Sequence, residues 1–348
     1  MLSVLGSGTL ALTCRLKAGG LIVNEHVLDR DETRRHVQVL GRWFDFIGLD
    51  ELPQCLDRRG KRPFCLLTFD DGKRSNATAV APELERLGVP AVFFLVASFI
   101  GGGTPLWFDR YRALRARLGS PPFGLSRRIV KQLPHEMLLE RLARACARHG
   151  VEADLTDDDV LPMTWDEARG LHRRGFRIGA HGFTHAIMTR ESRADAMENI
   201  AKGIARVGAE IGTPCTSFAF PNGNYTAELA RHAVRCGATT VMTTEPTWAD
   251  RRVPLWRLPR VQLCGSDSRE KIELKIALAA TGRILANPDG TGRVYARINR
   301  RARRAARREP MAPGDRSSGN PGPTDGRLPL PRTLASGEHG LASPPRPG

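Results

Sequence analysis

The stretch FCLLTFDDG, residues 64–72, joins a short apolar run to two adjacent carboxylates and a glycine. Its first six residues have the length and the apolar character of a fully buried strand. Asp70 and Asp71 follow at once, and a turn opening at Gly72 would bring both carboxylates to the same side of the strand end. The stretch therefore predicts a buried strand that delivers two carboxylates to one edge of a sheet.

Similar short strands alternate with helical patterns along most of the chain. We expect further strands at 91–97, 177–180, 217–220 and 239–243, and helices at 79–87, 165–174, 192–211 and 227–236. Thr164 and Glu167 form a capping box, which marks the start of one of these helices. Strands that alternate with helices are typical of a parallel sheet. The sequence therefore predicts an α/β fold.

Polar side chains with catalytic potential follow three of these strands. Asp70 and Asp71 follow the first, His181 follows RIGA at 177–180, and PNGN at 221–224 follows SFAF. In α/β barrels the active site gathers at the carboxyl ends of the strands. We therefore expect these groups to converge on one mouth.

His181 and His185, in the sequence HGFTH, would complete a metal site with Asp71. Two histidines and one carboxylate leave coordination positions open, as in catalytic zinc sites. Taken singly, Asp-Asp-Gly is also a common polar turn, and His-x-x-x-His also describes two unrelated surface histidines. Non-haem iron oxygenases use the same donor set, although the second aspartate and the α/β pattern disfavour that alternative.

TFDDG at 68–72, HGFTH at 181–185 and FAFPNGNY at 218–225, in this order, resemble the polysaccharide deacetylases of the NodB-homology class, carbohydrate esterase family 4. The resemblance runs from about Leu21 to Leu263 and includes the WRLPRV ending at 256–261. It implies a distorted (β/α)7-type barrel. It also implies a hydrolase that removes N-acetyl or O-acetyl groups from a polysaccharide or oligosaccharide in exopolysaccharide or cell-surface glycan biosynthesis. A hydrolase of small amides or cyclic imides remains an alternative on the same fold.

The resemblance also implies roles for individual residues. Asp70 matches the catalytic base. The matches to the metal ligands, which would hold a divalent ion, are Asp71, His181 and His185; zinc is expected, with cobalt or nickel as alternatives. Pro221, Asn222, Gly223 and Asn224 match the loop that lines the substrate groove. Arg260 is added to the substrate-binding residues because it could contact the site from the end of the last strand; the alternative is that it pairs with a carboxylate.

Two departures from the family pattern concern the base and the general acid. Many members carry Arg two residues before the loop proline, where this chain has Ala219, and the Leu-x-His that supplies the acid is missing. However, NEHV at 24–27 resembles the Tyr-His-x-Val phrase of a permuted branch, although Asn24 stands in place of the Tyr. His26 is therefore the candidate acid. The alternative is a buried histidine at a strand end, whereas His36 and His135 fall in polar helical patterns and are expected to face solvent.

The domain plan places a short N-terminal segment at 1–20 and the deacetylase-like domain at 21–265. An insertion with its own helical patterns interrupts that domain at about 101–162. A basic helical extension is expected at 266–308. The remainder, 309–348, is rich in Pro, Gly and Ser, and we expect it to be disordered because it has few apolar residues to bury.

The formal net charge of +16 limits the partners to be considered. Half of this excess lies after residue 290, where twelve Arg face four acidic residues. The basic run at 300–308 could attract nucleic-acid phosphates non-specifically or anionic lipids at a membrane surface. No nucleic-acid recognition motif accompanies it. We therefore expect an acetylated glycan substrate, no specific nucleic acid, and peripheral membrane contact as an open alternative.

The cysteines and the N-terminus bear on the compartment. The seven cysteines are scattered without a Cys-x-x-Cys pair, which is poor evidence for a disulfide framework. No run reaches the length needed to span a bilayer, and the start lacks the features of a signal peptide. A cytoplasmic location, with membrane association as an alternative, is expected.

Overall fold

A computed structural model describes residues 17–57, 62–102, 105–151 and 157–282 of the 348-residue chain. Eight parallel strands form one sheet in the order β7-β6-β5-β4-β3-β1-β8, and β2 pairs with β3 outside this path. The strands are β1 Gly20–Glu25, β2 Asp45–Phe46, β3 Phe64–Phe69, β4 Ala91–Leu95, β5 Arg177–Ala180, β6 Ser217–Ala219, β7 Thr240–Met242 and β8 Val261–Gln262.

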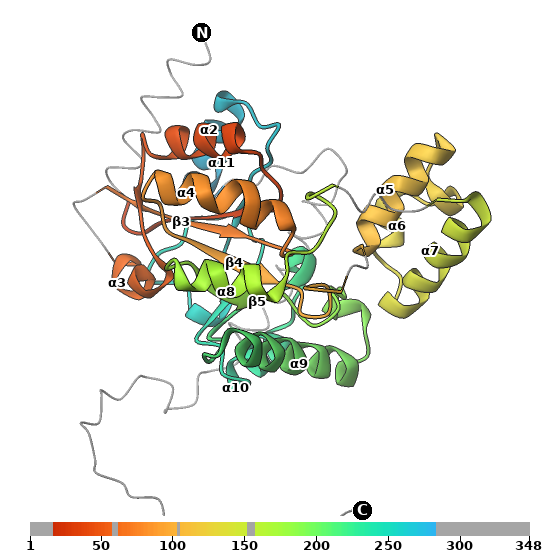
Figure 1. The fold of residues 1–348 in the computed structure, drawn as a ribbon. Coiled ribbons are helices and arrows are strands. Elements are labelled where there is room, and N and C mark those ends of the chain that lie inside the picture. The colour runs from red at the N-terminus through yellow and green to blue at the C-terminus, as the bar shows by residue number, and fades with distance from the viewer. Residues whose placement is uncertain (1–16, 58–61, 103–104, 152–156, 283–348) are drawn as a thin grey trace, which may run out of the picture. The chain divides into compact units, whose positions relative to one another are not determined.

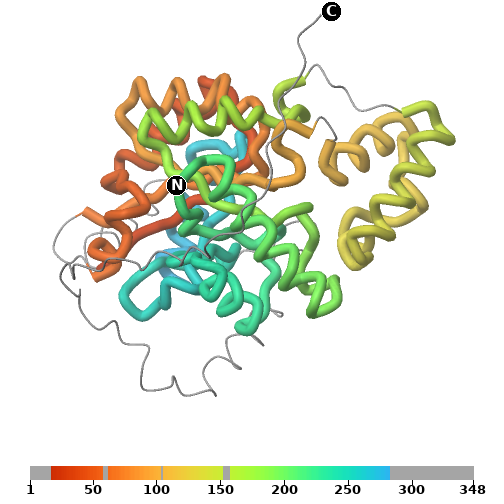
Figure 2. Tube along the Cα trace, turned by 60° about the horizontal axis from the view of Figure 1, so that its bottom comes forward, coloured from red at the N-terminus to blue at the C-terminus, as the bar shows by residue number. Residues whose placement is uncertain are grey.

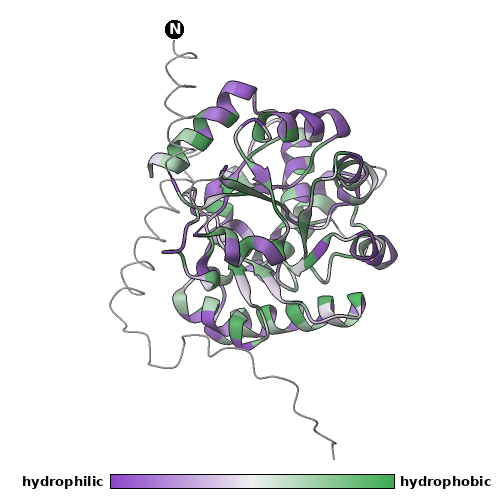
Figure 3. Cartoon of the chain, turned by 90° about the vertical axis from the view of Figure 1, so that its left-hand side faces the viewer, coloured by the Kyte–Doolittle hydropathy of each residue, from purple (hydrophilic) through white to green (hydrophobic). Residues whose placement is uncertain are grey.

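Helices surround this sheet (Figure 1). They are α2 Arg30–Leu40, α3 Leu52–Cys55, α4 Ala81–Arg86, α8 Trp165–Arg173, α9 Arg193–Ile211, α10 Ala227–Arg235 and α11 Arg269–Thr281. The capping box of α8 is formed as predicted, with Thr164 accepting from the backbone N–H of Glu167. In Figure 3 many helices show hydrophobic and hydrophilic residues side by side, as expected of helices with one buried face.

The central strands are buried on both faces, and their alternate residues enter two different clusters. In β3, Cys65, Leu67 and Phe69 join the large core that the surrounding helices share. Phe64 and Leu66 join a second cluster with residues of β1, β4, β6 and β7. The strand period of two therefore separates the helix-facing side of the sheet from its inner side.

The sheet curls until its two edges are joined. Leu258 makes a parallel bridge to Met242 of β7, and three residues later β8 begins its pairing with β1. All strands run in parallel, so their carboxyl ends lie at one rim. The predicted α/β fold of the distorted barrel type is confirmed.

The insertion after β4 forms a helical lobe with a small core of its own. Its helices are α5 Trp107–Leu118, α6 Arg127–Val130 and α7 His135–His149, drawn as the yellow group in Figures 1 and 2. Tyr111, Leu114 and Leu142 are buried in this core. The chain returns from the lobe beside the loop after β3, where the backbone N–H of Arg74 donates to Leu161 O at 2.9 Å and that of Met163 donates to Gly72 O at 3.0 Å.

Several elements differ from the sequence-based expectations. The ranges predicted as strands did not include β1, β2 or β8, none of which has a long apolar run, and pairing with distant strands stabilises all three. α4 is preceded by a π-helical turn, Asn76–Val80. The expectation that His36 faces solvent is wrong: it is 2% exposed, and its Nδ1 lies 2.7 Å from Glu25 Oε1.

Parts of the predicted domain plan lie outside the described residues. These are most of the N-terminal segment, the basic extension after α11, and the tail at 309–348. Within the residues that are described, no helix is both long and apolar enough to cross a membrane.

Candidate active site

The loop after β3 holds its two aspartates in an uncommon backbone conformation. Asp71 has φ +77° and Gly72 has φ +79°. A positive φ is costly for a residue other than glycine and often marks a functional site. Only four described non-glycine residues have it, and three belong to the motifs singled out above: Asp71, His185 and Asn222. The conformation aims Asp71 away from the direction that a continued strand would give it.

Asp71, His181 and His185 lie together at the carboxyl rim of the sheet. His185 Nε2 is 3.2 Å from Asp71 Oδ1, and His181 Nε2 is 3.6 Å from the same oxygen. One potential ligand atom of each residue lies within 4.8 Å of the others, and all three residues are buried. The two imidazole rings meet edge to face with centroids 5.1 Å apart. The structure thus brings together the three residues that the sequence singled out as a donor set.

A backbone contact fixes the orientation of His181. Its Nδ1 is 2.8 Å from Ala219 O, so this nitrogen carries the proton and Nε2 presents a lone pair towards Asp71. Burial lowers the pKa of His181 to about 4, so the ring is neutral at pH 7. Burial opposes ionisation of Asp71 as well, but the nearby His185 keeps the pKa of that carboxyl far below its usual value. A neutral imidazole and an ionised carboxylate are the forms that bind metal.

The residues present fit a divalent cation. Asp71 Oδ1 is buried and accepts no hydrogen bond, although buried carboxylate oxygens normally have a partner. Two imidazole nitrogens and one carboxylate oxygen within 4.8 Å of one another match the donor set of a three-ligand catalytic zinc site. The donor set could therefore hold zinc, cobalt or nickel.

Asp70 faces the inner side of the sheet, where a guanidinium and an amide hold it. Arg260 donates from Nη1 to Oδ1 at 2.7 Å and from Nη2 to Oδ2 at 2.8 Å. Asn24 donates to Oδ2 at 3.0 Å. Burial raises the pKa of Asp70, but the charges of Arg260 and His181 outweigh burial and hold it below its usual value. These bonds occupy three of about four acceptor positions of the carboxylate and leave one open.

The assignment of Arg260 to substrate binding needs correction. The side chain is 0% exposed, and its Nε donates to Thr243 O while the other nitrogens contact Asp70. It therefore positions the aspartate and does not reach solvent. Its contact makes up for Ala219, which cannot steady Asp70. Asn24, noticed in the sequence only as a departure from Tyr, is a second partner that no sequence signal identified.

His26 follows β1 and lies at the same rim. It is half-buried, and its charge contributes to the lowered pKa values of both Asp70 and Asp71. Its neighbour Glu25 points into the core instead, where it meets His36.

The loop PNGN follows β6 and continues the rim. Pro221–Gly223 form one short helical turn, and Asn222 Nδ2 donates to Asn224 Oδ1 at 2.6 Å. Gly223 has φ +73°, and a Cβ built there would lie 1.8 Å from Thr244 Oγ1, so only glycine fits. Asn222 is half-buried, whereas its three neighbours in the loop are buried. Asn222 is thus the side chain of this loop that is most open to a ligand.

The inserted lobe reaches the same place, which the sequence did not predict. The Phe108 ring lies edge to face on His185, with centroids 5.3 Å apart. The buried Lys73, two residues after Asp71, pairs with the buried Asp109 of the lobe. The backbone N–H of His135 donates to Glu191 Oε1 at 2.9 Å, and His135 is half-buried, contrary to expectation. The lobe therefore forms a wall of the candidate site.

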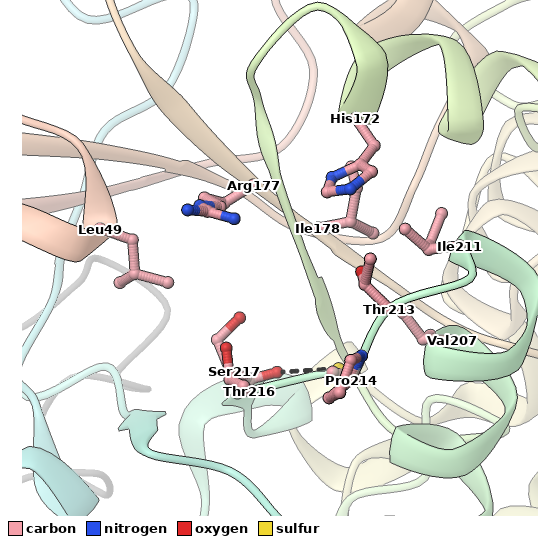
Figure 4. A pocket seen from close by; sticks show the side chains of 11 residues that line it. Leu49, His172, Arg177, Ile178, Val207, Ile211, Thr213, Pro214, Thr216 and Ser217 are labelled. Carbon is pink, nitrogen blue, oxygen red and sulfur yellow. Dashed lines mark hydrogen bonds between the residues drawn. The ribbon is translucent and has the colours of Figure 1, made fainter. Parts of the chain in front are cut away.

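A small hollow lies elsewhere, at the amino ends of β5 and β6 (Figure 4). His172, Arg177 and Thr213 are among the residues that line it. Arg177 is already paired with Asp50, and no pair of carboxylates or histidines faces the hollow. The residues that line it include no set comparable to the Asp71, His181 and His185 group, so the candidate active site is placed at the opposite rim.

Solved structures share this fold. The chain is similar to the deacetylase PplD of Streptococcus pyogenes in complex with acetate, at 14% identity and TM-score 0.50, over 75% of this chain and 99% of that one. It is also similar to IcaB from Ammonifex degensii, at 16% identity and TM-score 0.50, over 75% of this chain and 98% of that one. A third similar structure is the BpsB deacetylase domain from Bordetella bronchiseptica, at 16% identity and TM-score 0.50, over 70% of this chain and 96% of that one. At these identities the likeness shows the fold alone.

Sequence comparison identifies the family. No curated protein sequence matches the chain. The sequence model of the polysaccharide deacetylase family, however, matches residues 57–241, which is more than half of the chain and includes both the aspartate pair and the histidine pair. The chain therefore belongs to the polysaccharide deacetylase family, and it is a hydrolase of carbohydrate esterase family 4.

Proposed function

We propose that this protein removes acetyl groups from an acetylated polysaccharide or oligosaccharide with one divalent cation held by Asp71, His181 and His185. The observation that carries the proposal is the convergence of these three buried donors beside a second carboxylate, Asp70, which keeps one acceptor position open. When bound, such a cation supplies polarisation of the acetyl carbonyl and a lowered pKa of water. We expect zinc, with cobalt or nickel as alternatives.

Asp70 is the proposed general base. It would accept a proton from the attacking water while Arg260 and Asn24 keep its carboxylate oriented. Pro221, Gly223 and Asn224 would shape the groove, and Asn222 would contact the sugar. His26 would donate a proton to the departing nitrogen as the C–N bond breaks, which yields acetate and a free amine.

The physiological substrate is proposed to be a glycan of exopolysaccharide or cell-surface biosynthesis, because membership of the family supports that class. A small amide or cyclic imide is the competing substrate class. Acetate release from N-acetylglucosamine oligosaccharides, compared with turnover of simple amides, separates the two classes.

The proposed metal site is tested by measuring the metal content of the protein together with acetate release. Purified protein should contain about one divalent ion per chain, and His181→Ala and Asp71→Ala should lose both the ion and acetate release. His172→Ala, which changes a histidine beside the other hollow, is the matched control and should retain both. Full metal content in His181→Ala or Asp71→Ala would remove that residue from the proposed site.

The acid is tested by the leaving group. His26→Ala should retain the metal and should slow an acetylated amine far more than an activated acetyl ester, whose leaving group needs no proton. Equal slowing of both substrates, or of neither, would contradict the assignment.

A further inference from the structure

Positive charge is concentrated in two segments of this protein. Within residues 105–151, which hold the three helices of the lobe, ten Lys and Arg face three acidic residues, which gives a net charge of +7. The stretch after residue 290 carries +8. Five acidic residues follow the lobe helices, at 152–159, on the connection back to the barrel. Of the three acidic residues within 105–151, Asp109 is paired with Lys73 and Glu140 is paired with Arg144, so the helical part of the lobe is strongly basic.

The lobe is attached to the mouth at the proposed metal ligands themselves. Phe108 contacts the ring of His185, and Asp109 meets Lys73 two residues beyond Asp71. Lys73 Nζ also lies 5.2 Å from the centroid of the Phe108 ring. A buried ion pair and an aromatic contact fix this part of the lobe relative to the site. Side chains of the lobe that lie near Phe108 are therefore held at a constant place beside the proposed metal ligands.

Arg127 is such a group. Its guanidinium carbon lies 5.9 Å from the ring centroids of both Trp107 and Phe108, and the side chain is exposed. No carboxylate within the described part of the chain forms an ion pair with Arg127. At this distance the guanidinium is within the range of cation–π attraction, and such contacts leave the N–H donors of an arginine free. Arg127 therefore presents a cation next to a ring that touches His185.

We propose that the lobe recognises an anionic group, a carboxylate or a phosphate, on the acetylated glycan, with Arg127 as its contact residue. A planar guanidinium can bind either group with two parallel hydrogen bonds. The surrounding charge of +7 would attract such a glycan at longer range. A neutral glycan would gain nothing from these features. The inference rests on the proposed function, since it names the substrate class of the same site.

The experiment measures binding and acetate release in parallel for three probes. These are a neutral N-acetylglucosamine oligosaccharide, an oligosaccharide of equal length that alternates N-acetylglucosamine with glucuronate, and N-acetylglucosamine carrying a 1-phosphate. The first anionic probe tests a carboxylate of the polymer, and the second tests a phosphate at the end of a precursor. Wild-type protein is compared with Arg127→Gln and with Arg128→Gln, an exposed arginine of the same helix for which no ring contact is found within the described residues.

We expect at least one anionic probe to bind the wild type more tightly than the neutral probe. Arg127→Gln should weaken the binding of that anionic probe about ten- to hundredfold, the range of a lost hydrogen bond to a charged group, and should raise KM with little change in kcat. Binding of the neutral probe, and all values for Arg128→Gln, should change less than about twofold. Higher salt should reduce the preference of the wild type.

Two results would overturn the inference: no preference of the wild type for either anionic probe, or equal weakening of anionic and neutral probes by Arg127→Gln. Binding that depends on Arg127 without acetate release from any probe would support the inference and contradict the proposed deacetylation. Failure of the inferred anion recognition and failure of the proposed deacetylation therefore give different results.

Discussion

Asp70 and Lys73 lie three residues apart in the chain, and each forms a buried ion pair with a different part of the molecule. Asp70 pairs with Arg260 inside the barrel, and Lys73 pairs with Asp109 of the inserted lobe. All four side chains are at most 2% exposed. Burial raises the pKa of both carboxyls, but only for Asp70 do the neighbouring charges outweigh it, so the pKa of Asp70 falls and that of Asp109 rises.

The contrast shows that burial and charge pairing by themselves do not identify a functional group. The two pairs differ in what lies beside them. Asp70 lies among the candidate catalytic groups, with Oδ2 3.8 Å from His181 Nε2. Asp109 lies between Lys73 and Arg112, whose Nη2 is 3.5 Å from Oδ1, and aromatic rings flank Lys73. We infer that the first pair serves the reaction and the second fastens the lobe.

The largest expected effect is that of Asp70→Asn on turnover. The change keeps the shape but removes the proton acceptor, so acetate release per folded molecule should fall by about 10² to 10⁴. Metal content should remain near that of the wild type, because Asp70 is not among the proposed ligands. Acetate release within a few-fold of the wild type would show that Asp70 is not the base.

The second prediction concerns the stability supplied by the Lys73–Asp109 pair. Asp109→Leu leaves a buried ammonium without its partner and should lower the free energy of unfolding by about 3–5 kcal/mol, measured by urea titration. The double variant Lys73→Met/Asp109→Leu removes both charges and should regain most of this loss, with acetate release within about threefold of the wild type.

Replacing both charges of the Asp70–Arg260 pair tests whether the two ion pairs differ in their roles. Asp70→Leu/Arg260→Met should also regain much of the stability lost by Arg260→Met alone, but should remain inactive. An active Asp70→Leu/Arg260→Met variant, or an inactive Lys73→Met/Asp109→Leu variant that folds normally, would reverse the assignment of roles.

A smaller effect is expected for Asn24, which positions Asp70. Asn24→Ala removes one hydrogen bond to a charged oxygen, and kcat should fall about tenfold with KM and metal content unchanged. Asn24→Asp should lower kcat further, because a second carboxylate would repel Asp70. If Asn24→Asp were as active as the wild type, the contact would have no part in positioning the base.

The smallest effect is expected for an exposed ion pair of the lobe. Glu140 and Arg144 are one helical turn apart on α7, with an N–O distance of 2.7 Å and largely exposed side chains. Glu140→Ala should lower the free energy of unfolding by less than about 0.5 kcal/mol, because solvent screens such pairs. A loss comparable to that of Asp109→Leu would mean that burial does not separate the two kinds of pair.

Elements that depend on local pattern could be predicted from the amino-acid sequence. The strands Phe64–Phe69 and Arg177–Ala180 begin and end at the residues that the sequence predicted. The convergence of Asp71 with the two histidines also followed from the sequence, because parallel strands place their carboxyl ends at one rim. Short-range periodicity and strand direction are sufficient for statements of this kind.

Other contacts between distant residues could not be predicted and became visible in the folded structure. Arg260 contacts an aspartate 190 positions earlier, and its complete burial corrected the expectation that it binds substrate. The burial of His36 and the contact of Phe108 with His185 could not be predicted from the sequence either. Such contacts depend on the register between strands and on where an insertion packs. Hydrophobic periodicity carries no information on either, because it records which face of an element is buried and not which side chain lies opposite.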